Sequence, residues 1–286
     1  MTVIGEARTW AVAALVAFSV GSAQADDSQV QRGAYLVNTI GACGNCHTPK
    51  GADGHALPGQ ELSGGLVFDF PVFHAVVPNI TPDNDTGIGT WTDEQIANSI
   101  RNGKRPDGTT IGPPMPIGFY RNMSDSDVLA VVAYLRSVTP IPHKLEKSTF
   151  HIPLPESYGP TVVHVTDVPS DDKVAYGKYL ADIGHCMECH TPMTGDHLDM
   201  ARVGAGGREL PVFPAGVVIS ANLTPANENG IANWPDAQVE DAIVTGIRPD
   251  GRHLVLLMAF DWYKNVTRSD LDALVAYLRT LKPAKP

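Results

Sequence analysis

The strongest helical pattern in the sequence follows Ser124, where apolar residues recur at positions i, i+3, i+4 and i+7 of one helical face. This stripe consists of Val128, Val131, Val132 and Leu135. A second stripe with the same spacing follows Thr267 and consists of Leu271, Leu274, Val275 and Leu278. Ser and Thr are favourable N-cap residues, because their side-chain oxygens accept from free backbone N–H groups at a helix start. The pattern predicts two equivalent amphipathic helices.

Shorter helical patterns occur earlier in each half of the chain. We expect helices within 33–41 and 176–184, and one further helix after each of Trp91 and Trp234. The segments between them are rich in Gly, Pro and Asn and lack convincing strand alternation. Each half is therefore predicted to be mostly α, with about three to five short helices and long loops.

The two helices that follow the tryptophans have different start signals. Thr92 and Gln95 have the spacing of a capping box. In the second half, Pro235 is expected in the first helical turn, where a missing N–H leaves no hydrogen bond unmade.

The chain contains an internal repeat. The motif C-x-x-C-H-T-P begins at Cys43 and again at Cys186, an offset of 143 residues (186 − 43 = 143). The same offset also relates Asn79 to Asn222, Trp91 to Trp234, Arg105 to Arg248, Met115 to Met258, Tyr120 to Tyr263 and Tyr134 to Tyr277. So many matches without a net gap predict two tandem domains of one fold, 26–145 and 171–286. The proline-rich segment 146–170 has no helical period and is predicted to be an ordered linker.

The N-terminal segment 1–25 has the pattern of an export signal. Arg8 precedes an apolar run over 10–20, and Ala23 and Ala25 form an A-x-A cleavage site. The alternative is an uncleaved anchor, but the run is well short of the ~20 residues that span a bilayer. No later segment is long and apolar enough, so we expect a mature chain without a transmembrane anchor.

Composition and charge narrow the function classes. Hydrophobic residues make up 43% of the 286 residues and charged ones 18%, which is typical of a globular protein. The net charge of −10 argues against nucleic acid or anionic lipid as the main partner.

The four cysteines occur only in the two C-x-x-C-H motifs. Such pairs can form redox disulfides, but the βαβ context of those motifs is absent, and a zinc site would have to unite two copies of a duplicated domain. Neither alternative explains the histidine after each pair. Covalent attachment of haem c explains all positions, because two thiols bind the porphyrin and the adjacent histidine binds the iron. We therefore expect two covalently bound haem c groups.

The second axial ligand of each iron is predicted to be a methionine. Met115 and Met258 stand at the same spacing after the first cysteine of their motif (115 − 43 = 72 and 258 − 186 = 72). Met115 lies in a proline-rich loop, whereas Met258 lies in a flexible-looking apolar one, where packing alone is the usual role of methionine. His253 is a competing ligand in the second half, and Met187 lies inside a motif and cannot turn back onto the same iron.

The arrangement of helix, C-x-x-C-H, methionine loop and final helix resembles class I cytochrome c in each half. The longer strings GACGNCHTP, NITPDNDTGIGTWTDEQI and MSDSDVLAVVAYLRS resemble the cytochrome c subunits of membrane-bound bacterial alcohol, aldehyde and gluconate dehydrogenases. By matched position, the resemblance implies two sets of haem-binding residues. One set is Cys43, Cys46, His47 and Met115, and the other is Cys186, Cys189, His190 and Met258.

The sequence departs from that resemblance in two ways. Those subunits commonly carry three haems and a C-terminal membrane anchor, whereas this sequence has two motifs and ends in LKPAKP. We therefore expect a soluble shuttle or a loosely docked subunit.

The function predicted from these features is periplasmic electron transfer rather than catalysis. A periplasmic or membrane-bound dehydrogenase would be the donor, and an oxidase, a quinone-linked complex or a small cytochrome the acceptor. The protein would be periplasmic, or held at the membrane through a partner. The alternative is a dihaem redox enzyme, such as a peroxidase, in which the Met258 ligand exchanges; a haem-based sensor is disfavoured because no output domain is present.

Overall fold

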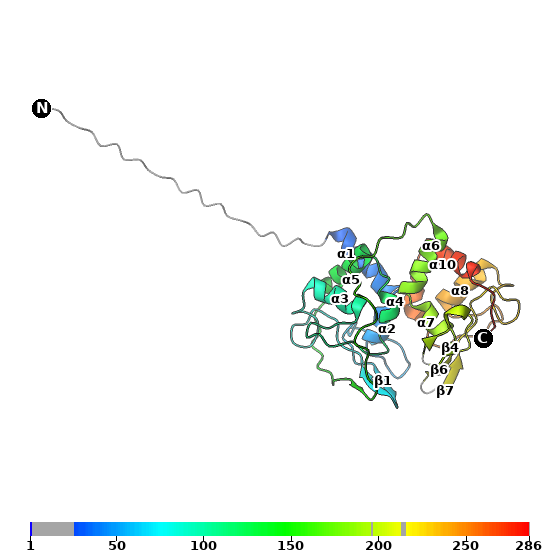
Figure 1. Cartoon of the computed structure of the whole chain (residues 1–286), viewed down its shortest axis with the longest axis horizontal. Helices are drawn as coiled ribbons and strands as arrows, with labels where there is room; N and C mark the ends of the chain where they lie inside the picture. Colours follow the sequence, from blue (N-terminus) through cyan, green and yellow to red (C-terminus); the bar gives the residue numbers. More distant parts are fainter. Residues whose placement is uncertain (2–25, 196, 213–215, 286) are drawn as a thin grey trace.

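A computed structural model describes residue 1 and residues 26–195, 197–212 and 216–285. Apart from Met1, the predicted export signal over 1–25 lies outside the described residues. The same order of five helices occurs twice, and Figure 1 shows the two halves side by side, the first in blue to green and the second in green to red.

The first half contains a long N-terminal helix, a one-turn helix over the cysteine motif, a small hairpin and three further helices. These elements are α1 (Asp27–Asn38), α2 (Cys43–His47), β1 (Val67–Phe70), β2 (Phe73–Val76), α3 (Asp93–Asn102), α4 (Ile117–Tyr120) and α5 (Asp125–Ser137). A short strand, β3 (Thr149–Phe150), pairs antiparallel with β2.

The second half repeats the helices and one hairpin, and it adds a second short hairpin and a 3-10 helix. Its elements are α6 (Lys173–Ile183), α7 (Cys186–His190), β4 (Met193–Thr194), β5 (His197–Leu198), the 3-10 helix η1 (Met200–Arg202), β6 (Glu209–Val212), β7 (Gly216–Ile219), α8 (Asp236–Thr245), α9 (Phe260–Tyr263) and α10 (Arg268–Thr280). β4 pairs with β5 and β6 with β7, both antiparallel.

The first and last helices of each half pack closely against each other, α1 on α5 and α6 on α10. A glycine lies at each crossing, Gly33 against Ala130 and Gly177 against Ala273. A Cβ on either glycine would stand 1.8 Å from the facing alanine carbonyl oxygen, so only glycine fits. The predicted apolar stripes of α5 and α10 are buried at these contacts.

The predicted helix starts are mostly confirmed. The Ser124 and Thr267 side chains cap α5 and α10, and Thr92 forms a complete capping box with Gln95. Pro235 is one residue out of the predicted place, because it is the N-cap of α8 rather than part of its first turn. The prediction erred because proline's fixed φ suits both positions.

The short strands were not predicted. β1, for example, alternates only between exposed and half-buried residues, because the hairpin lies at the edge of the molecule. Without a buried face, a strand needs no apolar alternation, so the sequence carries little signal for it.

The segment between the halves runs along the first half. Phe150 and Leu154 lie over Gly112, where a Cβ would stand 2.5 Å from the Phe150 ring. Further along, the Tyr158 hydroxyl donates to the carbonyl of Ile111 at 2.7 Å. The segment then reaches α5, where Asp125 N donates to the Val165 carbonyl and Val165 N donates to Asp125 Oδ1.

Candidate functional site

Residues of both halves line one cavity of about 1120 Å³. Its walls include all eight residues predicted from the sequence: Cys43, Cys46, His47, Met115, Cys186, Cys189, His190 and Met258. The competing ligand His253 is exposed and does not belong to the lining, and neither does Met187. The fold thus brings together four sequence motifs that lie far apart in the chain.

The cysteine pairs lie on the one-turn helices α2 and α7. The residue before each helix, Ala42 in one half and His185 in the other, has a left-handed backbone with φ of 42° and 41°. Non-glycine residues rarely adopt this conformation, and its recurrence at both motifs marks a constrained turn. The turn directs both cysteines of each motif into the cavity.

All four thiols are free, and burial strongly favours their neutral form. Burial raises the pKa of the Cys43 and Cys186 thiols to about 12 and that of Cys46 and Cys189 to about 11. Reactive redox thiols instead have lowered pKa values. Among the described residues, no group of three or more His, Cys, Asp and Glu side chains is arranged to hold a metal ion.

The two histidines are buried and oriented in the same way. His47 Nδ1 lies 2.9 Å from the carbonyl oxygen of Pro78, and His190 Nδ1 lies 2.8 Å from that of Ala221. A carbonyl only accepts, so Nδ1 carries the proton and the Nε2 lone pair is free to act as a ligand. Burial lowers the pKa of both imidazoles, which keeps them in the neutral form that binds metals.

These carbonyl partners were not recognised from the sequence. Pro78 and Ala221 differ in side chain, and a backbone acceptor leaves no residue-type signal. Their spacing holds one clue, because both directly precede the repeated Asn-x-Thr-Pro string and are themselves related by the repeat offset (221 − 78 = 143).

The two methionines occupy equivalent turns before the four-residue helices α4 and α9. The Met115 carbonyl accepts from Ile117 N, and the Met258 carbonyl accepts from Phe260 N, both at 2.9 Å. Both side chains are half-buried in the cavity wall. The loops before the two methionines differ in exposure. Val255, Leu256 and Leu257 before Met258 are exposed, whereas Gly112, the position equivalent to Val255, is covered by Phe150 of the segment between the halves.

Two arginines and two tryptophans at repeated positions also line the cavity: Arg105, Arg248, Trp91 and Trp234. The Arg248 guanidinium lies over the Trp234 ring, 5.3 Å from its centroid, and its buried Nε has no hydrogen-bond partner. Arg105 instead donates to the Thr110 carbonyl at 2.9 Å. Cationic groups therefore stand at the same place in both halves of the wall.

Comparison with known proteins gives the family. Residues 30–139 match the family described as cytochrome c. A protein named diheme cytochrome c-type from Cereibacter sphaeroides is 32% identical over 256 residues, which cover 84% of this chain and 81% of that protein. The chain belongs to the cytochrome c family, whose members carry covalently bound haem c and function in electron transport.

Further relatives are named as subunits of dehydrogenases. The cytochrome c subunit of a quinone-dependent alcohol dehydrogenase from Gluconobacter oxydans is 32% identical, over 84% of this chain and 52% of that subunit. The fructose dehydrogenase cytochrome subunit of Gluconobacter japonicus is 30% identical, over 92% of this chain and 54% of that subunit. The chain thus spans about half the length of these relatives.

The residues in the cavity fit haem c. The set of donors in each half consists of two thiols, one imidazole with a free Nε2 and one thioether. These are the groups by which c-type haem is attached and its iron is ligated. Among the described residues, no helix combines the length and apolar character needed to cross a membrane.

Proposed function

We propose that the chain is a dihaem electron-transfer protein made of two tandem cytochrome c domains. One haem would be attached to Cys43 and Cys46, and the other to Cys186 and Cys189. The observation that carries this proposal is the shared cavity, which both C-x-x-C-H motifs and both methionines line.

The axial ligands would be His47 with Met115, and His190 with Met258. The Pro78 and Ala221 carbonyls hold the imidazoles with Nε2 free, which supports the assignment. When bound, each haem supplies one iron that gains or loses a single electron, and methionine ligation raises its potential. If one imidazole and one thioether held each iron, no position would remain for a substrate, which favours electron transfer over catalysis.

The protein's own residues would exclude water and hold each group in place. The cavity wall is largely apolar, with Leu36, Ile96 and Val131 in the first half and Leu274 and Leu278 in the second. A low-polarity wall limits how far the surroundings rearrange when the charge on the iron changes.

The donor is proposed to be a dehydrogenase, because several relatives are named as cytochrome subunits of such enzymes. The acceptor would be an oxidase, a quinone-linked complex or a small cytochrome. The export pattern ending at Ala25 and the occurrence of c-type attachment outside the cytoplasm support a periplasmic location.

Haem stoichiometry and ligation test this function. Intact-mass measurement of the purified protein should show two haems, and each of C43A/C46A and C186A/C189A should lose one. Met115→Ala and Met258→Ala should each remove the sulfur-to-iron charge-transfer band of one haem and lower one of two reduction potentials. A protein with one haem, or two haems that keep their spectra in both methionine variants, would contradict the assignment.

A dihaem redox enzyme is a second candidate, favoured by the exposure of the loop before Met258. Val255, Leu256 and Leu257 are 37%, 47% and 37% exposed, so this ligand loop has less support than its counterpart. If Met258 exchanges, cyanide or peroxide should alter the spectrum of the second haem within the mixing time. If both ligands are permanent, neither reagent should act quickly.

A further inference from the structure

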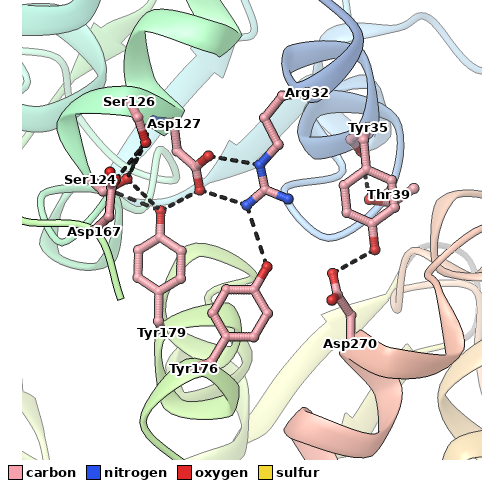
Figure 2. A network of polar contacts seen from close by, with 10 residues as sticks. All are labelled: Arg32, Tyr35, Thr39, Ser124, Ser126, Asp127, Asp167, Tyr176, Tyr179 and Asp270. Atoms are coloured by element: carbon pink, nitrogen blue, oxygen red, sulfur yellow. Dashed lines mark hydrogen bonds and ion pairs between the residues drawn. The ribbon is translucent and has the colours of Figure 1, made fainter. Parts of the chain in front are cut away.

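Two equivalent tyrosines cross between the halves, each from the first helix of one half to the last helix of the other. The Tyr35 hydroxyl on α1 donates to Asp270 Oδ2 at 2.7 Å and accepts from Thr267 N at 3.1 Å. The Tyr179 hydroxyl on α6 donates to Asp127 Oδ2 at 2.6 Å and accepts from Ser124 N at 3.2 Å. Figure 2 shows both contacts in one view.

The repeat relates the two contacts atom for atom. Asp127 and Asp270 are related by the repeat offset (270 − 127 = 143), and each tyrosine lies two positions after the glycine of its helix crossing, Gly33 or Gly177. This reciprocity is the pattern of a two-fold interface, in which the same surface of each partner contacts the other. Both carboxylates are buried, with 5% and 7% of the residue exposed, so neither tolerates the loss of its partners easily.

The two carboxylates differ in the number of side chains that bond them. Arg32 adds a bidentate ion pair to Asp127, with Nε to Oδ1 and Nη2 to Oδ2 both at 2.8 Å (Figure 2). At the position equivalent to Arg32, one residue before the glycine, the second half has Tyr176. For the Asp270 carboxylate, Tyr35 is the one side-chain hydrogen-bond partner among the described residues.

The same interface places the two cysteine motifs close together. The Trp262 indole of α9 lies against Gly44 in α2, where a Cβ would stand 2.8 Å from Nε1. Conversely, the Tyr120 ring of α4 lies edge-on to His185, just before α7, with 5.9 Å between the ring centroids. Each attachment helix is thus packed against the helix that follows the methionine of the other half.

We propose that the Tyr35–Asp270 and Tyr179–Asp127 contacts are a positioning device for electron exchange between the two haem sites. They tie together the helices that flank both sites and so hold α2 and α7 at a fixed separation within one cavity. Tyr35, Tyr179 and Arg32 act through these helices and do not touch the reacting groups. The inference rests on the proposed function, because it requires two haems.

The test uses the full-length holoprotein with Tyr35→Phe, Tyr179→Phe and the double variant, each of which removes only hydroxyl groups. Tyr134→Phe is the matched control, because the Tyr134 hydroxyl accepts from Asn38 Nδ2 at 2.9 Å within one half. Haem count and absorption spectra are recorded first. A wild-type count other than two is a failure of the proposed function and is recognised before any variant is compared.

Two readouts then address the interface. The first is hydrogen exchange of two backbone amides. The Ser124 amide is followed in Tyr35→Phe, which retains its acceptor, the Tyr179 hydroxyl. The Thr267 amide is followed in Tyr179→Phe, which retains its acceptor, the Tyr35 hydroxyl. We expect exchange to accelerate by about tenfold, the ratio that corresponds to the loss of one hydrogen bond to a charged group. The control should leave both amides as in the wild type.

The second readout is the rate of electron exchange between the two haems in half-reduced protein, measured by NMR line broadening. We expect the double variant to exchange electrons more slowly than the wild type and than either single variant, because the two sites are then held less firmly at their short separation, with haem count and ligand spectra unchanged. Faster amide exchange with an unchanged electron-exchange rate would overturn the positioning role. Unchanged amide exchange would show that the contacts do not hold the halves together and would overturn it equally.

Discussion

The carbonyl oxygen of Ala130 lies 1.8 Å from the point where a Cβ on Gly33 would stand, and the oxygen of Ala273 lies equally close to that point on Gly177. The first and last helices of each half therefore touch backbone to backbone. Tyr35 and Tyr179 follow these glycines by two positions, so the same crossings also set where the tyrosines leave their helices.

Gly33→Ala and Gly177→Ala should each destabilise the protein by roughly 3 kcal/mol, because the helices must separate to admit the methyl group. Denaturant unfolding of the holoprotein, followed by circular dichroism, measures the effect. Gly118→Ala is the control, since a Cβ there meets no atom within 4 Å, and its free energy of unfolding should change by less than about 1 kcal/mol. Equal effects at Gly33 and Gly118 would contradict the packing.

The helices and the cavity residues could be predicted from the sequence because both leave repeated residue types. Helical spacing identified the stripes after Ser124 and Thr267, and the repeat offset selected Met115 and Met258 from seven methionines. Residues related by this offset were expected at equivalent places in the two halves, and the structure brings all eight candidate residues to one cavity.

The contacts between the halves could not be predicted in this way. Tyr35 and Asp270 are 235 residues apart, and their contact depends on how the two halves of the chain pack against each other. Tyr35 and Tyr179 also depart from the repeat offset by one (179 − 35 = 144), because the segment before the second cysteine motif is one residue shorter. A strict offset therefore pairs Tyr179 with the wrong residue.

Arg32 and Tyr179 both bond Asp127, so each can partly compensate for the loss of the other. Arg32→Leu and Tyr179→Phe should each cost about 1 to 2 kcal/mol of stability, whereas the double variant should cost more than their sum by about 1 kcal/mol. The reason is that only the double variant leaves the buried carboxylate without a side-chain partner. A double-mutant cycle in denaturant unfolding measures the coupling, and strict additivity would show that Asp127 is satisfied in another way.

Gly112 and Val255 are equivalent positions with opposite surroundings, since the Phe150 ring covers the first and the second is exposed. Gly112→Val should displace Phe150 and Leu154 and open the wall beside Met115. We expect faster reaction of the first haem with cyanide, measured by absorption, and little change at the second. Gly118→Ala is again the control, because a Cβ at Gly118 meets no atom within 4 Å. If cyanide reacts with Gly112→Val at the wild-type rate, Phe150 does not protect the wall beside Met115.

Asp125 joins the inter-half segment to α5 and should release it in acid. An ion pair with Arg101 is the main cause that lowers the pKa of Asp125 to about 2 from 3.8, and contacts with His164 and Val165 contribute. Because this pKa is lowered in the folded state, the ionised Asp125 stabilises the fold above pH 3.8, and this contribution is lost as the pH falls through about 2.

Pepsin cleavage near Val165 should therefore accelerate in the wild type as the pH falls from 3.8 to about 2. In Asp125→Asn, cleavage should already be fast at the upper end and depend less on pH, because the Arg101 ion pair is absent throughout. Ser137→Ala is the matched control, because the Ser137 hydroxyl donates to the Tyr134 carbonyl at the far end of α5, and this variant should follow the wild-type profile.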